Sequence, residues 1–388
     1  MQKRVVDAVD EFVDVFEADD ERLFELIKTK RIDILVNLDF PSKELRNRVF
    51  SRRPAPVQAN YLGYPGTAAV GDCDYLIADS AVIPPERRRH YLEKILYLPD
   101  SYQPNDSQRE IAARPMRRGE MGLPEEGIVF CCFNRNLKLN PETLDGWSRI
   151  LLASPGSVLW LLEDNLTASG NLRKEAAARG VDPPRLVFAK KVPHEDQLAR
   201  HRLADLFLDT LPCNAHTTAS DALWAGLPVL TRIGDTFAGR VGASLLTAIG
   251  LPEMIVATQE EYEATAIDLA ANPDRLRALK EKLARNRLTA PLFDVRLTRP
   301  VSERRSKRCT RADSPICRPT TSTRPRQQRR GPPLALRRDR PNFEIRLRRV
   351  ASRGHDAPHL DASPAGGREG AGAADSPSAS RSGPRNAS

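Results

Sequence analysis

The sequence has no apolar run long enough to cross a membrane. Spanning a bilayer takes about 20 consecutive apolar residues, and no stretch among the 388 residues approaches this. Met1 is followed by charged, helix-like sequence rather than by the apolar centre of a signal peptide. We therefore expect a soluble, cytoplasmic protein with no membrane partner.

Cysteine is scarce, and its spacing excludes the common zinc sites. The six cysteines lie far apart or side by side, without a CxxC pair or a nearby histidine pair. We expect reduced thiols and no metal. Cys131 and Cys132 lie in an apolar run, which predicts that they are small core residues of a strand.

Aromatic residues make up only 6% of the chain, and the net positive charge is confined to the C-terminal part. Residues 301–388 hold 20 Lys and Arg against 8 Asp and Glu, a net charge of +12. Residues 1–300 hold 40 against 43 and are mildly acidic, at −3. The total of +9 therefore does not predict a nucleic-acid-binding surface on the folded part.

The first hundred residues alternate between helical and strand-like patterns. Apolar residues at helical spacing occupy positions 5–16, at Val5, Val9, Phe12, Val13 and Phe16, and a second helix is expected near 22–28. A buried strand is predicted at 32–36. The stretches 53–58, 61–67 and 75–79 follow as strand, Gly/Pro loop and strand, which is typical of the carboxyl edge of an open α/β sheet.

A polar, irregular stretch at 110–123 indicates a linker, and a second alternating region follows it. Repeated strand–helix–strand predicts a parallel, doubly wound sheet. Strands are expected at 128–133, 158–162, 185–188, 205–208 and 228–231, with helices near 141–152, 172–179, 196–202, 218–225, 241–249 and 260–285.

The most informative segment runs from an apolar strand at 205–208 through a polar loop into a short helix. That helix begins at Thr217 and Thr218 and ends at Gly226. Its N–H groups, two hydroxyls and positive dipole end suit a phosphate or diphosphate, and Asp221 could accept hydrogen bonds from ribose hydroxyls. For an isolated helix start, an ordinary N-cap beside a loop histidine, His216, is the simpler interpretation.

Lys138 follows the first strand of the same region. A lysine in such a place is usually a solvated surface charge. Here its loop should face the same crevice as the helix start, where a cation would neutralise a diphosphate leaving group.

In combination, these motifs resemble the catalytic region of protein O-GlcNAc transferases, including bacterial and SPINDLY-type relatives. The resemblance spans about residues 1–297 and is carried, in order, by RPAPVQ at 53–58, LGYPGT at 62–67, Phe133-Asn134 with Lys138, and CNAHTT through DALWAG at 213–226. It implies a GT-B fold with two Rossmann-like lobes. It also implies transfer of N-acetylglucosamine from UDP-GlcNAc to Ser or Thr of a protein acceptor, without metal or other cofactor.

The resemblance also implies roles for individual residues. Lys138 matches the catalytic, diphosphate-binding lysine, and Arg135 stands near the donor where the family often has Gln or Asn. The remaining donor-binding positions are Thr217 and Thr218 for phosphate, Asp221 for ribose, His216 and Cys213 beside the sugar, Arg200 beside uracil, and Leu62, Gly63 and Pro65 in a loop that closes over the sugar.

The chain departs from the family pattern in several places. Gln197 replaces a histidine that stacks on uracil, and Asp39-Phe40-Pro41 replaces a typical Asn-Gly-Tyr/His sequence. We therefore expect weaker UDP binding. An upstream HPTSH-like segment and the tetratricopeptide repeats of the family precede the region matched here, so we expect an incomplete first lobe and an incomplete acceptor side.

We expect three parts: a partial N-terminal lobe at 1–115, a nucleotide-sugar-binding lobe at 120–297 and a basic tail at 298–388. The tail lacks helix or strand periodicity, and its composition predicts disorder. Its abrupt Arg/Pro/Ser-rich onset is typical of a shifted reading frame; an RNA-binding tail is the alternative, which the scarcity of aromatic residues disfavours. For function, a UDP-binding protein without turnover and a transferase using another nucleotide sugar stay open.

Overall fold

The structure is a computed structural model that describes residues 2–38, 47–67 and 72–294. The basic segment 298–388 lies outside the described residues, and so do the substituted positions 39–41. The predictions made for these two segments therefore concern parts of the chain about which the structure says nothing.

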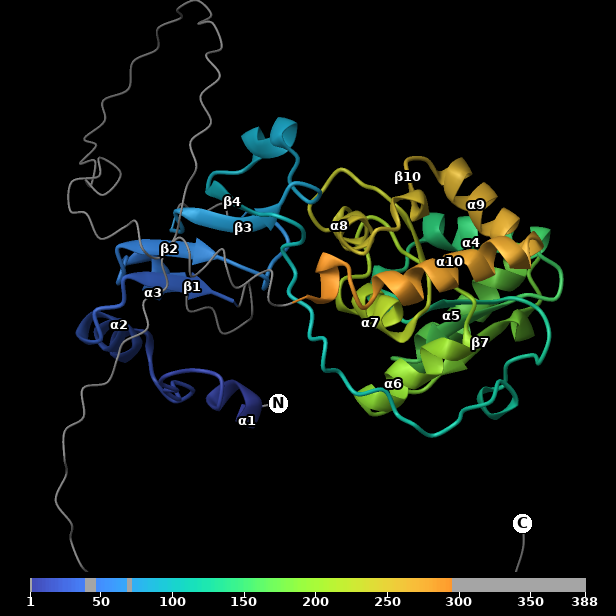
Figure 1. The fold of residues 1–388 in the computed structure, drawn as a ribbon, viewed down its shortest axis with the longest axis horizontal. Coiled ribbons are helices and arrows are strands. Elements are labelled where there is room, and N and C mark those ends of the chain that lie inside the picture. The colour runs from blue at the N-terminus through green and yellow to red at the C-terminus, as the bar shows by residue number, and fades with distance from the viewer. Residues whose placement is uncertain (1, 39–46, 68–71, 295–388) are drawn as a thin grey trace, which may run out of the picture. The chain divides into compact units, whose positions relative to one another are not determined.

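Four parallel strands form the first sheet, in the order β1-β2-β3-β4 (Figure 1, blue). Each strand is short and partly or fully buried, and two small helices, α2 and α3, pack against each other beside it. The elements are α2 (Asp20–Thr29), β1 (Ile34–Asn37), α3 (Asn47–Ser51), β2 (Val57–Asn60), β3 (Tyr75–Asp79) and β4 (Lys94–Leu98).

Six parallel strands form the second sheet, in the order β10-β9-β8-β5-β6-β7. The chain starts at β5, moves outward through β6 and β7, then returns to β8 beside β5 and moves outward the other way. This is the strand order of dinucleotide-binding folds, in which ligands bind where the order reverses, outside the carboxyl ends of β5 and β8. The strands are β5 (Val129–Cys132), β6 (Val158–Leu162), β7 (Leu186–Ala189), β8 (Leu206–Leu208), β9 (Val229–Arg232) and β10 (Ile255–Val256).

Seven α-helices connect these strands or follow them. Helix α9 packs beside both α4 and α10, and α6 packs beside α7 (Figure 1). Their bounds are α4 (Pro141–Ala153), α5 (Leu166–Ala178), α6 (His194–Arg200), α7 (Thr217–Ala225), α8 (Val241–Ala248), α9 (Gln259–Ala271) and α10 (Pro273–Asn286).

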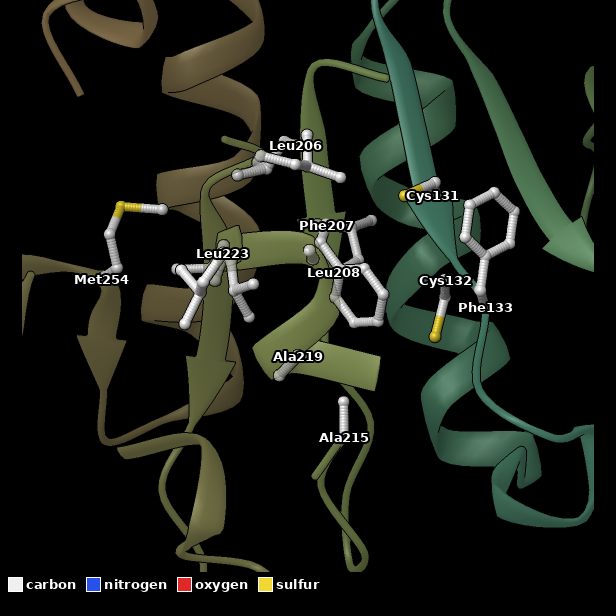
Figure 2. Packing of buried hydrophobic residues seen from close by; sticks show 14 of the residues in the cluster. Cys131, Cys132, Phe133, Leu206, Phe207, Leu208, Ala215, Ala219, Leu223 and Met254 are labelled. Atoms are coloured by element: carbon white, nitrogen blue, oxygen red, sulfur yellow. The ribbon is translucent and has the colours of Figure 1, made fainter. Parts of the chain in front are cut away.

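The core of the second sheet confirms the interpretation of the paired cysteines. Cys131 and Cys132 on β5 are 0% and 1% exposed, as small core residues should be. Figure 2 shows them near Phe207 and Leu208 of the neighbouring strand β8, with Ala219 of α7 in the same cluster. Burial on both faces explains why these strands are almost continuously apolar.

The prediction of a helix at positions 5–16 is mostly wrong. Helix α1 covers only Gln2–Val6, and residues 7–19 are turns and irregular chain. The apolar side chains that produced the helical pattern remain exposed, with Val5 at 48% and Phe16 at 78%. A short helix is marginal in water unless its apolar face is buried, so the pattern alone does not stabilise it.

Two other expectations need correction in the second region. The helix expected at 260–285 is two helices, because the chain breaks at Asn272 before Pro273, which starts α10. Helix α5 begins at Leu166, six residues before the expected start, because the Asn165 side chain caps the N–H groups of Thr167 and Ala168. The two-residue strand β10 was not expected.

The α/β class with doubly wound parallel strands is confirmed. The segment 110–118 has neither helix nor strand, consistent with a connection between the two sheets. Among the described residues, no helix has the length and apolar character that a bilayer crossing requires.

Candidate functional site

Lys138 lies at the point where the strand order reverses, in the loop that leaves β5. Its Nζ donates a hydrogen bond to the carbonyl oxygen of Asn214 at 2.5 Å. Asn214 belongs to the loop that leaves β8, so the two loops expected to face one crevice are in contact. Arg135, in the same loop as Lys138, is exposed.

A buried carboxylate, Asp209, organises the loop after β8. Its Oδ1 accepts hydrogen bonds from the N–H groups of Thr210 at 2.8 Å and Ala215 at 2.6 Å. Its Oδ2 accepts one from the Thr231 hydroxyl at 2.7 Å. Gly242 lies against this group, because a Cβ there would approach Asp209 Oδ2 to 2.7 Å. The Asp209 side chain therefore fixes the loop that leads into α7 through hydrogen bonds to its backbone.

A chain of side-chain hydrogen bonds joins both loops to α7. The Thr218 hydroxyl donates to Asn134 Oδ1 at 2.8 Å, and Asn134 Nδ2 donates to the Thr210 hydroxyl at 2.9 Å. The Thr210 hydroxyl in turn donates to the carbonyl oxygen of Cys213 at 2.7 Å. Cys213 is half-buried and is a free thiol. The start of α7 is thus fixed relative to β5 and β8.

The first turn of α7 has no capping side chain. His216 precedes it at φ −100° and ψ −92° and makes no capping hydrogen bond, unlike Asn140 before α4 or Thr258 before α9. Within the described residues, no hydrogen bond reaches the backbone N–H groups of 217–219. Free N–H groups at the positive end of a helix favour an anion.

His216 is neutral near pH 7. Its Nε2 lies 3.2 Å from the carbonyl oxygen of Ala238, and since a carbonyl only accepts, Nε2 carries the proton in this contact. Burial and the positive charge of Lys138 lower the pKa of His216 to about 4. The ring beside the helix start therefore offers an Nδ1 lone pair without adding charge.

Two other α7 residues of the expected site differ in environment. Thr217 is exposed at the first helical position. Asp221 lies one turn further on, is 6% exposed, and forms an ion pair with Arg109. The structure thus brings Lys138, His216 and α7 together, with Asp221 on the buried side of the helix.

Arg200 is almost fully buried, at 2% exposure. Its guanidinium lies 4.7 Å from the ring centroid of Phe133 and donates to the Lys190 carbonyl oxygen at 2.6 Å and to the side-chain oxygen of Gln197. Burial lowers the pKa of Arg200 to about 10. In the described part of the chain, Arg200 Nε and Gln197 Nε2 are buried donors without an acceptor.

Leu62, Gly63 and Pro65 lie in the loop after β2. Leu62 adopts φ +63°, a conformation that a non-glycine residue rarely adopts. The N–H of Gly63 donates to the Tyr61 carbonyl oxygen at 2.8 Å, which closes a tight turn. Between these three residues and Lys138 or α7, the described ranges show no hydrogen bond or ion pair.

Sequence reasoning did not single out Asp209, Asn134 or Arg109. A signal existed for Asp209, since an acidic residue directly after a buried strand and before the polar loop is placed to bind loop N–H groups. Asn134 was part of the family pattern but received no role. Nothing local distinguished Arg109 from the other charged residues near it.

Asp209 should make the stability of the chain depend on pH. Burial raises the pKa of Asp209 to about 6, whereas an unfolded aspartate titrates near its ordinary value of about 3.9. Between these values the folded chain binds the extra proton, so this group's contribution to stability falls as pH rises from about 4 to 6. Above pH 6, the contribution of Asp209 to the free energy of unfolding is lower by about 3 kcal/mol than it is below pH 4.

Asp209→Asn removes this titration while keeping a side-chain carbonyl acceptor. We expect the free energy of unfolding of D209N, relative to the unsubstituted chain, to rise between pH 4.5 and pH 7.5. Urea denaturation at the two pH values measures it, and comparing the two proteins cancels the titration of the histidines. If the difference in unfolding free energy between the two proteins were the same at both pH values, Asp209 would be ionised over this whole range.

Among the described residues, no group of three or more His, Cys, Asp and Glu side chains is arranged to hold a metal ion. The positive charge next to the uncapped helix is supplied by Lys138. In the part of the chain that the structure describes, the side chains and backbone gathered here are the Lys138 ammonium group, the helix N-terminus, the His216 imidazole and the buried Asp209 carboxyl group.

Comparison with known proteins gives matches along most of this region. The model of glycosyl transferase family 41 matches residues 1–114 and 108–299. A probable UDP-N-acetylglucosamine-peptide N-acetylglucosaminyltransferase, SEC, of Arabidopsis thaliana is 39% identical over 301 residues, covering 76% of this chain and 31% of the relative. The UDP-N-acetylglucosamine-peptide N-acetylglucosaminyltransferase of Caenorhabditis elegans is 27% identical, covering 70% and 33%. The chain spans about a third of the length of these relatives.

Solved structures give the same fold. A mutant O-GlcNAc transferase of Thermobaculum terrenum is 34% identical, with a TM-score of 0.68, covering 76% of this chain and 56% of that one. Anabaena HepE, solved with UDP and glucose, is 14% identical, with a TM-score of 0.52 over 77% of this chain and 87% of that one, and shows the fold alone. The expected GT-B fold is confirmed.

Proposed function

Because this chain belongs to glycosyl transferase family 41, we propose that it binds UDP-GlcNAc at α7 and transfers N-acetylglucosamine to Ser or Thr hydroxyls of proteins. The observation that carries the proposal is the uncapped start of α7 beside Lys138, at the point where the strand order reverses. Three unbonded N–H groups and one ammonium group in such a place suit the two phosphates of a nucleotide sugar.

The diphosphate contacts would come from two elements. Lys138 Nζ, which now donates to a loop carbonyl, would turn toward a phosphate oxygen. The N–H groups of 217–219 and the exposed hydroxyl of Thr217 would bind the others, and the Thr218 hydroxyl would complete the set by exchanging its Asn134 partner for phosphate. Arg135, exposed in the Lys138 loop, would add positive charge at the rim.

The other parts of the donor would lie around this centre. His216 and Cys213 would flank the sugar, and the loop with Leu62, Gly63 and Pro65 would close over it from the first sheet. Asp221 would accept ribose hydroxyls. For uracil, the buried N–H groups of Arg200 and Gln197 that lack acceptors are suited to base carbonyl oxygens.

Transfer then needs stabilisation of a leaving group more than it needs strong acid–base chemistry. The bond between the sugar C1 and the β-phosphate oxygen breaks while C1 bonds to the acceptor oxygen, whose proton passes to water. Negative charge grows on the diphosphate as UDP leaves. A fixed ammonium and a helix N-terminus oppose that charge without reorganising, which is the usual source of rate enhancement.

Calorimetric titration of the purified chain with UDP tests the binding half of this proposal. Thr218→Val keeps the side-chain shape but removes the hydroxyl, so we expect UDP affinity to fall about tenfold, the value of one charge-assisted hydrogen bond. Uridine, which carries no phosphate, should bind both proteins alike. Thr167→Val is the matched control, because Thr167 lies in the first turn of α5, which Asn165 already caps.

Incubation with labelled UDP-GlcNAc and Ser/Thr peptides tests the second half. Labelled peptide supports the transferase, whereas UDP binding without transfer would favour the alternative of a non-catalytic nucleotide-binding protein. Thermal stabilisation by UDP-glucose or GDP-fucose above that by UDP-GlcNAc would favour another donor. Absence of UDP binding would remove the proposal.

A further inference from the structure

A buried ion pair links the expected ribose residue to the connection between the two sheets. Arg109 donates from one terminal nitrogen to Asp221 Oδ1 and from the other to the Ser220 hydroxyl at 3.2 Å. The side chains of Arg109 and Asp221 are 11% and 9% exposed. Arg109 belongs to the irregular segment after β4, 112 residues before Asp221 in sequence.

Arg109 is itself held in place by two aromatic rings. Its guanidinium carbon lies 5.5 Å from the ring centroids of both Trp224 and Phe293. The indole N–H of Trp224 donates to the Arg109 carbonyl oxygen at 3.0 Å. Both backbone and side chain are therefore fixed against α7, so the guanidinium has little freedom to leave the carboxylate.

The connection is attached to α7 at a second point. The Ser220 hydroxyl donates to Asn105 Oδ1 at 2.5 Å, and Asn105 Nδ2 donates to the Leu292 carbonyl oxygen at 3.3 Å. Residues 105–109 thus lie across consecutive residues of the helix. The connection therefore contacts α7 through Ser220 and Asp221, next to each other in sequence.

The geometry leaves one oxygen of that carboxylate available. Arg109 occupies Asp221 Oδ1, and His194 Nε2 lies 3.9 Å from the same oxygen. Within the described ranges, Oδ2 has no hydrogen bond. A charged, nearly buried carboxylate with one free oxygen is an acceptor suited to neutral hydroxyl groups.

Burial and the ion pair act on the ionisation of Asp221 in opposite directions. The pKa of Asp221 is raised on balance, because desolvation by burial outweighs the lowering effect of the positive charge of Arg109 and the smaller one of His194. Removing Arg109 would therefore leave burial largely unopposed. The carboxyl group would then take up a proton at a higher pH than it does now.

We propose that Arg109 is a positioning residue for nucleotide binding: it keeps Asp221 ionised and oriented so that Oδ2 accepts the ribose hydroxyls. This inference rests on the proposed binding of a UDP-sugar at α7. Arg109 acts only through Asp221 and contacts no part of the nucleotide. Its effect must therefore depend on the hydroxyls and on pH.

Arg109→Gln tests this in calorimetric titrations with UDP and with 2′,3′-dideoxy-UDP at pH 7.5 and pH 5.5. We expect R109Q to bind UDP about tenfold to a hundredfold more weakly than the unsubstituted chain, as for loss of a hydrogen bond to a charged group. The dideoxy nucleotide should bind both proteins with similar affinity. The UDP affinity of R109Q should also fall further at pH 5.5, while that of the unsubstituted chain changes little.

Arg118→Gln is the matched control. Arg118 belongs to the same connection and forms a similar, partly buried ion pair with Asp205 at 2.7 Å, but Asp205 precedes β8 at the opposite end of the strand. R118Q should lower the melting temperature without changing UDP affinity or its pH dependence. Repeating the R109Q titrations with His194→Gln added removes the contribution of that histidine.

Arg109→Lys keeps the proposal testable if R109Q does not fold, since lysine retains the charge but cannot donate to Asp221 and Ser220 from two separate nitrogens. It should recover the pH independence and part of the affinity. Equal UDP binding by R109Q and the unsubstituted chain would overturn the proposal, and so would an equal loss for UDP and dideoxy-UDP. Failure of the unsubstituted chain to bind either nucleotide would instead remove the proposed function.

Discussion

Replacing Lys138 with alanine is expected to lower the rate of transfer from UDP-GlcNAc by about a hundredfold to a thousandfold, as for loss of one preorganised charge at a leaving group. The ammonium group lies between the loops that leave β5 and β8 and is close enough to Asp209 and His216 to influence the pKa of both. Initial rates with labelled UDP-GlcNAc and a peptide acceptor measure the effect.

Two comparisons separate loss of charge from collapse of the loop, because Lys138 also donates to Asn214. If the loop is intact, K138A should lose affinity for UDP but keep its affinity for uridine. Lys174→Ala removes an equal charge from the exposed face of α5 and should leave transfer unchanged. Parallel losses of uridine and UDP binding in K138A would mean that Lys138 supports the loop rather than the diphosphate.

Replacing Asp79 with alanine is expected to lower the free energy of unfolding by about 3–5 kcal/mol, because it leaves several buried donors without an acceptor. Asp79 is 1% exposed at the end of β3. Its Oδ1 accepts from the N–H groups of Ala81 and Val82, and its Oδ2 accepts from the N–H of Tyr102 at 2.8 Å and the Ser244 hydroxyl at 2.6 Å. Urea denaturation gives the change.

One of these four hydrogen bonds, the one from the Ser244 hydroxyl, links the end of β3 to α8. Asp79→Asn keeps one carbonyl acceptor and should give an intermediate loss. Asp100→Ala removes an exposed carboxylate after β4 and should change stability by no more than about 0.5 kcal/mol. If D79A were as stable as D100A, water would have replaced the carboxylate, and the hydrogen bonds of Asp79 would contribute little to stability.

Much of the second sheet could be predicted because its signals are local. An apolar run, a polar loop, two threonines and a terminal glycine predicted α7, and the structure confirms a helix that ends at Gly226 with φ +93°. β6 was predicted with its observed ends, and Pro141 was correctly placed at the start of α4. In each case the signal that predicted the element lies within the element or directly beside it.

Predictions failed where the outcome depended on a distant partner. Apolar spacing near the N-terminus resembled a helix, but Phe12 and Phe16 remain exposed, and periodicity does not reveal whether a face is covered. The near-complete burial of Arg200 against Phe133 was not foreseen, because Phe133 is 67 positions away in sequence. The Arg109–Asp221 pair had no local signal.

The sequence by itself determined the kinds of elements, their order and the residue types available for an anion site, because propensity, capping and turn chemistry act over a few residues. Tertiary structure decided which of those residues meet. Placing β8 beside β5 brings Lys138 against a loop 76 residues away, and the folded chain also pairs Asp221 with Arg109 from 112 residues away. Strand order follows from packing of the whole sheet, so the site it creates cannot be read from any single segment.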